Sequence, residues 1–172
     1  MSGDSQEVVV ITDTSVLVNF LCIDRMDLIA SHSHRFMITE HVKEEITDHY
    51  PEQQDRLSAA LADGTLEVIA VSGDMALDLF RILSETRRLG AGESAAIACA
   101  IANNYAMAID DRAAAAQARL LKADLVVLGS QDIMVHLIQS EVIDVAEADQ
   151  IKETWAISHR FRLGISSFSE IL

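Results

Sequence analysis

A run of β-branched residues near the start of the chain most strongly limits the fold. Residues 8–11 are Val, Val, Val and Ile, and the polar Thr12 and Asp13 follow them. A strand without a polar face suits the centre of a parallel sheet, where helices cover both sides. Residues 7–12 are therefore predicted to form a buried central strand.

Further apolar runs alternate with helical patterns along the rest of the chain. Strands are predicted at residues 36–39, 66–71, 105–109 and 125–128, and helices at 14–21, 24–30, 40–48, 54–62, 75–86, 93–103, 112–121, 131–139 and 147–158. This alternation implies parallel pairing through right-handed crossovers, and hence an α/β protein with a central parallel sheet. No repeat or domain boundary interrupts the pattern, so residues 1–172 are expected to form a single domain.

Composition narrows the class of protein further. Half of the 172 residues are hydrophobic and only one is proline, which argues against long linkers. Cys22 and Cys99 lie in apolar helical patterns without metal-type spacing, as in a reduced, intracellular protein. Residues 1–7 are polar and acidic, and no stretch approaches the roughly 20 apolar residues of a membrane span. The sequence thus predicts a soluble, cytoplasmic protein without a signal peptide.

The net charge restricts how the chain can meet a nucleic acid. Its 27 acidic and 13 basic side chains give a formal charge of −14. This balance argues against binding by phosphate neutralisation alone. It remains compatible with a nuclease whose bound metal ions carry the local positive charge, and with a basic protein partner.

Carboxylates stand where parallel strands end. Asp13 follows the first strand, Asp110 and Asp111 follow the strand at 105–109, and Glu93 follows Gly90-Ala91-Gly92 at a helix start. In parallel sheets, sites form at the carboxyl ends of strands near a switch in strand order. Unpaired carboxylates repel one another, and Mg²⁺ or Mn²⁺ prefers oxygen ligands. These acids are therefore predicted to converge on one or two divalent ions.

Structural explanations compete with this prediction. Asp13 would be an ordinary helix N-cap, Glu93 would stabilise a helix terminus, and one of the adjacent aspartates Asp110 and Asp111 would cap the next helix. Thr14 and Ser15 are common helix-start residues as well as hydroxyl donors for a carboxylate or a phosphate.

Glu45 depends on the orientation of its helix. By itself it is a typical solvated helix acid, and it becomes a candidate only if its face points at Asp13. Glu40 and Glu44 are competing positions on the same helix.

Other catalytic patterns are absent from the sequence. It contains no P-loop, no third glycine of a dinucleotide fingerprint, no zinc-type spacing of histidines and no serine elbow. His32 and His34 are predicted to be exposed in a polar turn.

Four segments, taken in order, resemble the PIN-domain family. They are Val-Ile-Thr-Asp13-Thr-Ser, then Val42-x-x-Glu45-Ile46, then Gly90-x-Gly92-Glu93-x-x-x-Ile97-Ala98-x-Ala100, and finally Ile109-Asp110-Asp111-Arg112-x-Ala114. The similarity spans about residues 8–135, and residues from about 136 to 172 form a helical extension beyond the short PIN toxins. The Gly-x-Gly-Glu step before an alanine-rich helix makes the combination fairly specific.

The resemblance implies a fold, an activity and partners. The fold is a Rossmann-like, three-layer α/β/α sandwich whose acidic pocket binds Mg²⁺ or Mn²⁺. The activity is endoribonuclease, often as the toxin of a toxin–antitoxin pair, with homodimers usual. Asp13, Glu45 and Glu93 match the first three family acids, and the fourth falls on Asp110 or Asp111.

The leading hypothesis is a metal-dependent nuclease that hydrolyses single-stranded RNA. Asp13, Glu93 and Asp110 or Asp111 would hold the ions, with Glu45 completing the shell and Thr14, Ser15 or Asn19 orienting a phosphate oxygen. One alternative is an inactive PIN-like interaction module. The other is a metal-dependent nuclease acting on DNA, because no residue pattern in the sequence indicates recognition of the 2′-hydroxyl that distinguishes RNA from DNA.

Overall fold

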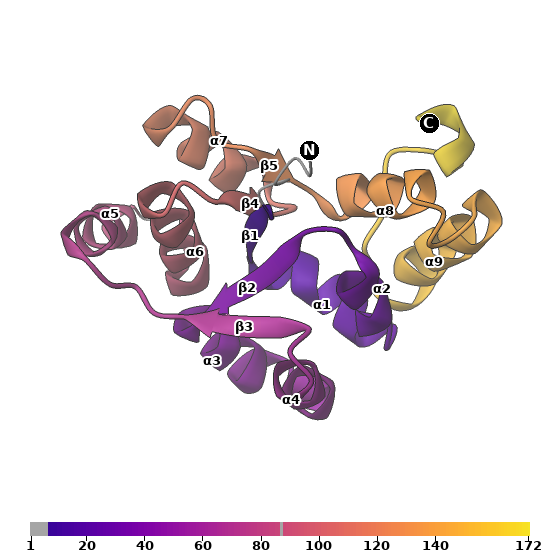
Figure 1. Ribbon diagram of the computed structural model, residues 1–172, viewed down its shortest axis with the longest axis horizontal. Coiled ribbons are helices and arrows are strands. Elements are labelled where there is room, and N and C mark those ends of the chain that lie inside the picture. The colour runs from indigo at the N-terminus through magenta and orange to yellow at the C-terminus, as the bar shows by residue number, and fades with distance from the viewer. Residues whose placement is uncertain (1–6, 87) are drawn as a thin grey trace, which may run out of the picture.

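The computed structural model describes residues 7–86 and 88–172, and they form a parallel sheet covered by helices (Figure 1). The strands are β1 (Val9–Thr12), β2 (Arg35–Thr39), β3 (Leu66–Ile69), β4 (Ala106–Ala108) and β5 (Val127–Leu128). The helices are α1 (Thr14–Cys22), α2 (Met26–Ser31), α3 (Glu40–His49), α4 (Gln54–Ala62), α5 (Asp74–Ser84), α6 (Ala91–Ala102), α7 (Arg112–Leu121), α8 (Ser130–Gln139) and α9 (Val145–Ser158), with 3₁₀ turns η1 (Pro51–Gln53) and η2 (Phe168–Glu170). The predicted three-layer α/β architecture is confirmed.

The strand order is β3-β2-β1-β4-β5, so β1 is central as predicted. Val10 of β1 pairs in parallel with Phe36 on one side and with Ala106 on the other. The chain moves outward from β1 to β3 and then returns to the opposite side of β1 at β4. This switch in strand order lies between β1 and β4, which places the residues after these two strands side by side.

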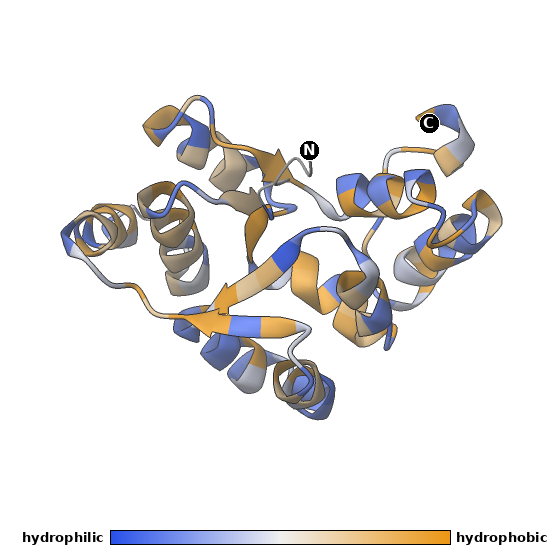
Figure 2. Cartoon of the chain, viewed as in Figure 1, coloured by the Kyte–Doolittle hydropathy of each residue, from blue (hydrophilic) through white to orange (hydrophobic). Residues whose placement is uncertain are grey.

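Two apolar cores, one on each face of the sheet, follow from the alternation of side chains along the strands. Val10 and Phe36 pack with residues of α1–α4, α8 and α9, whereas Ile11 and Met107 pack with residues of α5, α6 and α7. Figure 1 shows the two groups of helices on either side of β1 and β4, and Figure 2 shows the strands coloured mostly as hydrophobic. Burial on both faces explains why β1 lacks a polar side.

Element boundaries differ modestly from the predictions. The helix that carries Glu93 begins at Ala91, and β4 and β5 are shorter than the predicted strands. The apolar pattern around Val18, Leu21 and Leu28 fits either the core or a subunit contact. Leu21 and Leu28 are buried in the core, and Val18 is half-buried and packs against it. Among the helices within residues 7–86 and 88–172, none combines the length and the apolar character that a membrane span requires. The predicted absence of a signal peptide concerns residues 1–7, nearly all of which lie outside the described range.

The C-terminal extension packs onto the core through the single tryptophan. The fully buried Trp155 of α9 meets Phe20 of α1 edge-on, with ring centroids 5.5 Å apart. Its Nε1 donates a hydrogen bond of 2.7 Å to the backbone carbonyl of Asn19. The extension therefore contacts the same helix that follows Asp13.

Candidate metal and nuclease site

Asp13 lies at the end of β1, at the switch in strand order. It is 2% exposed and is the N-cap of α1, because one carboxylate oxygen, Oδ2, accepts hydrogen bonds from the backbone N (3.2 Å) and the hydroxyl (2.9 Å) of Ser15. The other oxygen, Oδ1, is buried and has no hydrogen-bond partner. Burial raises the pKa of Asp13, and the negative charge of Asp110 raises it further. The capping explanation is correct, but it accounts for only one of the two oxygens.

Asp110 and Asp111 point to different partners. Asp110 accepts hydrogen bonds from Asn19 Nδ2 (3.0 Å), Ser130 N (2.8 Å) and Ser130 Oγ (2.6 Å). Burial raises the pKa of Asp110 despite these hydrogen bonds. Asp111 is exposed and caps α7 through Ala114 N at 2.8 Å. One member of the pair is thus held inside the site, and the other stands at its edge.

The hydroxyl of Ser15 joins the two strand ends. It donates to Asp13 Oδ2 and accepts a hydrogen bond of 3.2 Å from the backbone N of Asp110. Asn19 Nδ2 similarly binds both Asp110 and the Ser130 hydroxyl, at 3.0 and 3.1 Å. Ser15 and Asn19, predicted to orient a phosphate, therefore orient carboxylates in this structure. The Thr14 hydroxyl is buried without a hydrogen-bond partner.

Glu45 faces the site rather than solvent. Helix α3 packs against α6, and Glu45 Oε2 lies so close to Gly92 that a Cβ at that position would be 2.3 Å away. Glu45 is half-buried, whereas Glu40 and Glu44 are exposed. Burial raises the pKa of Glu45, followed by the negative charge of Asp13. The structure thus selects Glu45 among the three candidate acids of this helix.

Glu93 combines a structural contact with proximity to the other acids. Its Oε2 accepts a hydrogen bond of 3.1 Å from the backbone N of Gly90, at the start of α6. Burial raises its pKa, and so do the charges of Asp13, Asp111 and Glu45. The helix-start explanation therefore holds for Glu93, and the negative charges of the other acids also act on it.

The acids gathered here lack a positive counterpart. Among residues 7–86 and 88–172, no basic side chain forms an ion pair with any of the five candidate acids, which are Asp13, Glu45, Glu93, Asp110 and Asp111. Within the same residues, no three carboxylate, histidine or cysteine groups converge tightly enough to hold one ion by themselves. Mg²⁺ commonly binds one or two carboxylates and keeps several waters. Oxygen ligands, repulsion between the acids and the partnerless Asp13 oxygen fit such a hydrated divalent ion.

Two polar residues of this region were not predicted as site residues. Ser130 is fully buried and holds Asp110 with both its backbone N and its hydroxyl. Asp132 accepts a hydrogen bond of 2.7 Å from Gly129 N, and its charge raises the pKa of Asp110. The segment Gly129-Ser130-Gln131-Asp132 has the composition of a helix start, which conceals its contact with the strand ends.

The histidine prediction was wrong for His32. This side chain is only 7% exposed and stacks on His136 of α8, with ring centroids 4.1 Å apart. His34 lies 4.7 Å from His32 by the same measure. The cause is tertiary, because α8 covers the turn before β2.

The comparisons with known proteins agree with this fold. A family model described as a PIN domain matches residues 9–172. A PilT N-terminus domain protein from the hyperthermophilic archaeon Sulfolobus solfataricus P2 is 16% identical, with a TM-score of 0.52 over 73% of this chain and 90% of that chain.

The crystal structure of VapBC2 from Rickettsia felis, bound to a DNA fragment from its promoter, contains a chain that is 14% identical, with a TM-score of 0.48 over 71% of this chain and 98% of that chain. No curated protein sequence matches the chain significantly. Because the family model covers nearly all of the sequence, this chain belongs to the PIN-domain family.

Proposed function

We propose that this protein is a metal-dependent endoribonuclease that hydrolyses phosphodiester bonds in single-stranded RNA. The observation that carries the proposal is the set of carboxylates without cationic partners at the strand switch, including the buried, partnerless Oδ1 of Asp13. Membership of the PIN-domain family supports it.

The site residues have distinct roles in this proposal. Asp13, Glu93, Asp110 and Asp111 hold Mg²⁺ or Mn²⁺, directly or through water, and Glu45 completes the acidic shell. Bound divalent ions supply an activated water and stabilise the charge on the leaving oxygen. Ser15, Asn19 and Ser130 keep the aspartates in position through the hydrogen bonds described above. The water oxygen joins phosphorus and the bond to the 3′ oxygen breaks, which leaves a 3′-hydroxyl and a 5′-phosphate.

Cleavage of matched RNA and DNA oligonucleotides in Mn²⁺ tests the activity and the substrate class. Asp13→Asn should abolish cleavage of single-stranded RNA, and Glu45→Gln should reduce it at least about tenfold, since removing one catalytic group typically costs that much or more. Glu44→Gln is the matched control, because Glu44 lies on the exposed side of the same helix. Cleavage by Asp13→Asn at the wild-type rate would refute the proposal. If wild type cleaved only DNA, the protein would be a DNA nuclease and not a ribonuclease.

Thermal unfolding tests the metal site without any substrate. An ion that binds only the folded protein should stabilise it by about 2.7 kcal/mol at a hundredfold excess over its dissociation constant. The Mn²⁺-induced shift should be large in wild type, unchanged in Glu44→Gln and lost in Asp13→Asn. An equal shift in all three proteins would place the ion elsewhere.

We further propose that the protein acts as the toxin of a toxin–antitoxin pair and forms a homodimer, as the family resemblance implies. Induced expression should arrest growth for wild type and not for Asp13→Asn. Light scattering of the purified protein should give twice the mass of 18.8 kDa. Unimpaired growth on wild-type induction would remove the toxin role, and a monomeric mass would remove the dimer.

A further inference from the structure

A pocket of about 350 Å³ adjoins the acidic site. Its lining includes three acids, Asp110, Asp111 and Asp132, and three arginines, Arg112, Arg119 and Arg162. The arginines come from α7 and from the C-terminal tail, whose residues 161–164 line the pocket together with Gly129 and Gln131 from the start of α8. The pocket thus brings together acidic and basic groups that are far apart in the sequence.

The three arginines are available for a ligand. All three are exposed, and none forms an ion pair with a described residue. Acidic side chains outnumber basic ones in this chain, 27 to 13, yet these three guanidinium groups line one pocket together. A planar guanidinium matches phosphate oxygens with two parallel hydrogen bonds.

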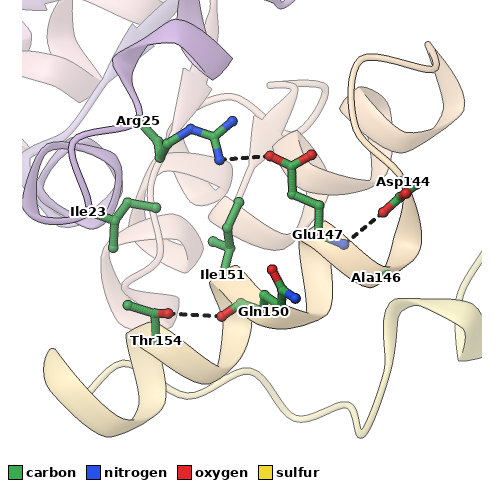
Figure 3. Close-up of a pocket in the computed structure, with 8 residues that line it drawn as sticks. All are labelled: Ile23, Arg25, Asp144, Ala146, Glu147, Gln150, Ile151 and Thr154. Carbon is green, nitrogen blue, oxygen red and sulfur yellow. Dashed lines mark hydrogen bonds and ion pairs between the residues drawn. The ribbon is translucent and has the colours of Figure 1, made fainter.

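A second pocket shows the contrasting case. A hollow of about 540 Å³ beside α9 has Arg25 and Glu147 in its lining. Figure 3 shows these two side chains pointing toward each other, joined by a dashed line. Arg25 donates to Glu147 at 2.8 Å and to Asp27 at 2.9 Å, so its charge is already balanced within the protein. An anionic ligand there would have to displace these carboxylates.

The tail that carries Arg162 is anchored on both sides. Phe161 packs edge-on against Trp155, with ring centroids 5.5 Å apart. Further along, the carboxylate of Asp149 accepts hydrogen bonds from Ser167 Oγ (2.6 Å) and Phe168 N (2.9 Å), and the side chain of Phe168 is fully buried. These contacts hold the segment against the core, so the pocket is preformed and little ordering entropy opposes binding.

We propose that Arg119 and Arg162, together with Arg112, bind a backbone phosphate of single-stranded RNA next to the phosphodiester that is cleaved. This inference rests on the proposed nuclease function and assigns a substrate-binding role to the C-terminal extension. The arginines supply positive charge beside the acidic site, where a phosphate next to the cleaved phosphodiester would lie.

Binding of a fluorescent single-stranded RNA, measured in EDTA at several salt concentrations, tests this site without metal chemistry. Arg119→Gln and Arg162→Gln should each weaken binding about three- to tenfold. Each should also flatten the plot of log affinity against log salt by about 0.7, the value for one lost phosphate contact on a single strand. Arg160→Gln is the matched control, because Arg160 is exposed in the same tail and does not line the pocket. Unchanged melting temperatures would show that the variants fold.

The outcomes separate this inference from the nuclease proposal. Wild-type affinity and salt dependence in both Arg119→Gln and Arg162→Gln would overturn the phosphate site, even if wild type cleaves RNA. Equal weakening by Arg160→Gln, or no RNA binding by wild type, would also overturn it. Arginine-dependent binding by a wild-type protein that fails to cleave in Mn²⁺ would uphold the phosphate site and refute the nuclease.

Discussion

Asp13 and Asp111 each cap a helix through one carboxylate oxygen, Oδ2 in Asp13 and Oδ1 in Asp111. The other oxygen of Asp13 has no partner although it is buried. A buried, unsatisfied acceptor typically costs about 1–3 kcal/mol of stability, and more when it is charged. The protein keeps this unpartnered carboxylate oxygen at the strand switch although it lowers stability. Such a loss of stability is expected at a site that binds a ligand.

Replacing Asp13 should reveal this cost as a pH effect. Because the pKa of Asp13 is raised in the folded protein, the folded state releases this proton at higher pH than the unfolded state does. Stability is therefore lost as pH rises from the unfolded value of 3.8 through the folded value. In EDTA, Asp13→Asn should melt several degrees above wild type at pH 7, and the difference should shrink towards pH 4.

Two controls accompany the Asp13 melting experiment. Glu44→Gln, on the exposed side of α3, should show no such pH-dependent gain. Addition of Mn²⁺ should reduce the advantage of Asp13→Asn, because the metal stabilises only the intact site. A variant less stable than wild type at pH 7 in EDTA would contradict the argument.

A substitution at Gly92 should reduce cleavage more than it changes the melting temperature. An alanine Cβ there would meet Glu45 Oε2 at 2.3 Å, so the flexible glutamate must move away. Alanine also favours a helix over glycine by roughly 0.5–1 kcal/mol. Gly92→Ala should therefore keep or slightly raise the melting temperature while cleavage falls, as measured on the same preparation. Gly90→Ala, where a Cβ meets nothing within 4 Å, should leave Glu45 in place and keep cleavage.

At the scale of elements, the turn before β2 and helix α8 meet through three imidazoles. His32, His34 and His136 contact one another, and Ser33 Oγ lies 2.8 Å from His136 Nε2. Burial lowers the pKa of His32 to about 3, and the neighbouring histidines contribute to the shift. This junction is therefore built around a neutral His32.

Acid should weaken this junction. The unfolded chain protonates His32 near its ordinary pKa of 6.5, whereas the folded protein resists protonation until about pH 3. Stability is thus lost as pH falls through this window. His32→Phe keeps an aromatic ring against Phe36 and removes the titration. The melting temperature of His32→Phe minus that of wild type should therefore be at least about 4 °C larger at pH 4 than at pH 7. For a chain of this size, each kcal/mol of stability shifts the melting temperature by about 2–4 °C.

The matched control for the histidine junction is His159→Phe, because His159 is exposed and lies outside the cluster. It should follow the wild-type dependence of melting temperature on pH. If the melting temperature of His32→Phe showed the same dependence on pH as that of wild type, the junction would have no role in acid stability.

At the scale of the whole molecule, the extension and the sheet share one core. Trp155, the single tryptophan, lies in α9 and contacts Phe20 of α1. We propose that the two parts unfold together as a single domain. Trp155 fluorescence, which reports on the extension, and far-ultraviolet circular dichroism, which reports on all helices, should then give the same denaturant midpoint. An earlier fluorescence transition would show that the extension unfolds separately.

Truncating this contact should damage the entire fold. Trp155→Ala removes a fully buried indole and its hydrogen bond to Asn19, and large-to-small changes of this kind cost about 3–5 kcal/mol. Both probes should report the loss equally. Ile157→Ala, in the same helix but 77% exposed, should change either midpoint little.

Local periodicity and the chemistry of strand ends and helix starts were enough to predict the parallel sheet and the central position of β1. They also suggested the candidate acids Asp13, Glu93 and the pair Asp110 and Asp111, without choosing between the two members of the pair. These features follow from short-range rules: apolar runs form buried strands, and the carboxyl ends of parallel strands meet at one edge of the sheet. Glu45 required the family resemblance, since its spacing alone does not distinguish it from Glu40 or Glu44.

Contacts between distant segments were decided only by tertiary structure. The packing of α3 against α6 turned Glu45 towards Gly92, and α8 brought Ser130 to Asp110 and His136 to His32. The tail placed Arg162 beside the arginines of α7. Each depends on side chains separated by tens of residues, whose meeting is set by helix packing and strand order rather than by local pattern. Local sequence patterns thus place acids after the buried strands, whereas helix packing brings in the residues that hold and surround these acids.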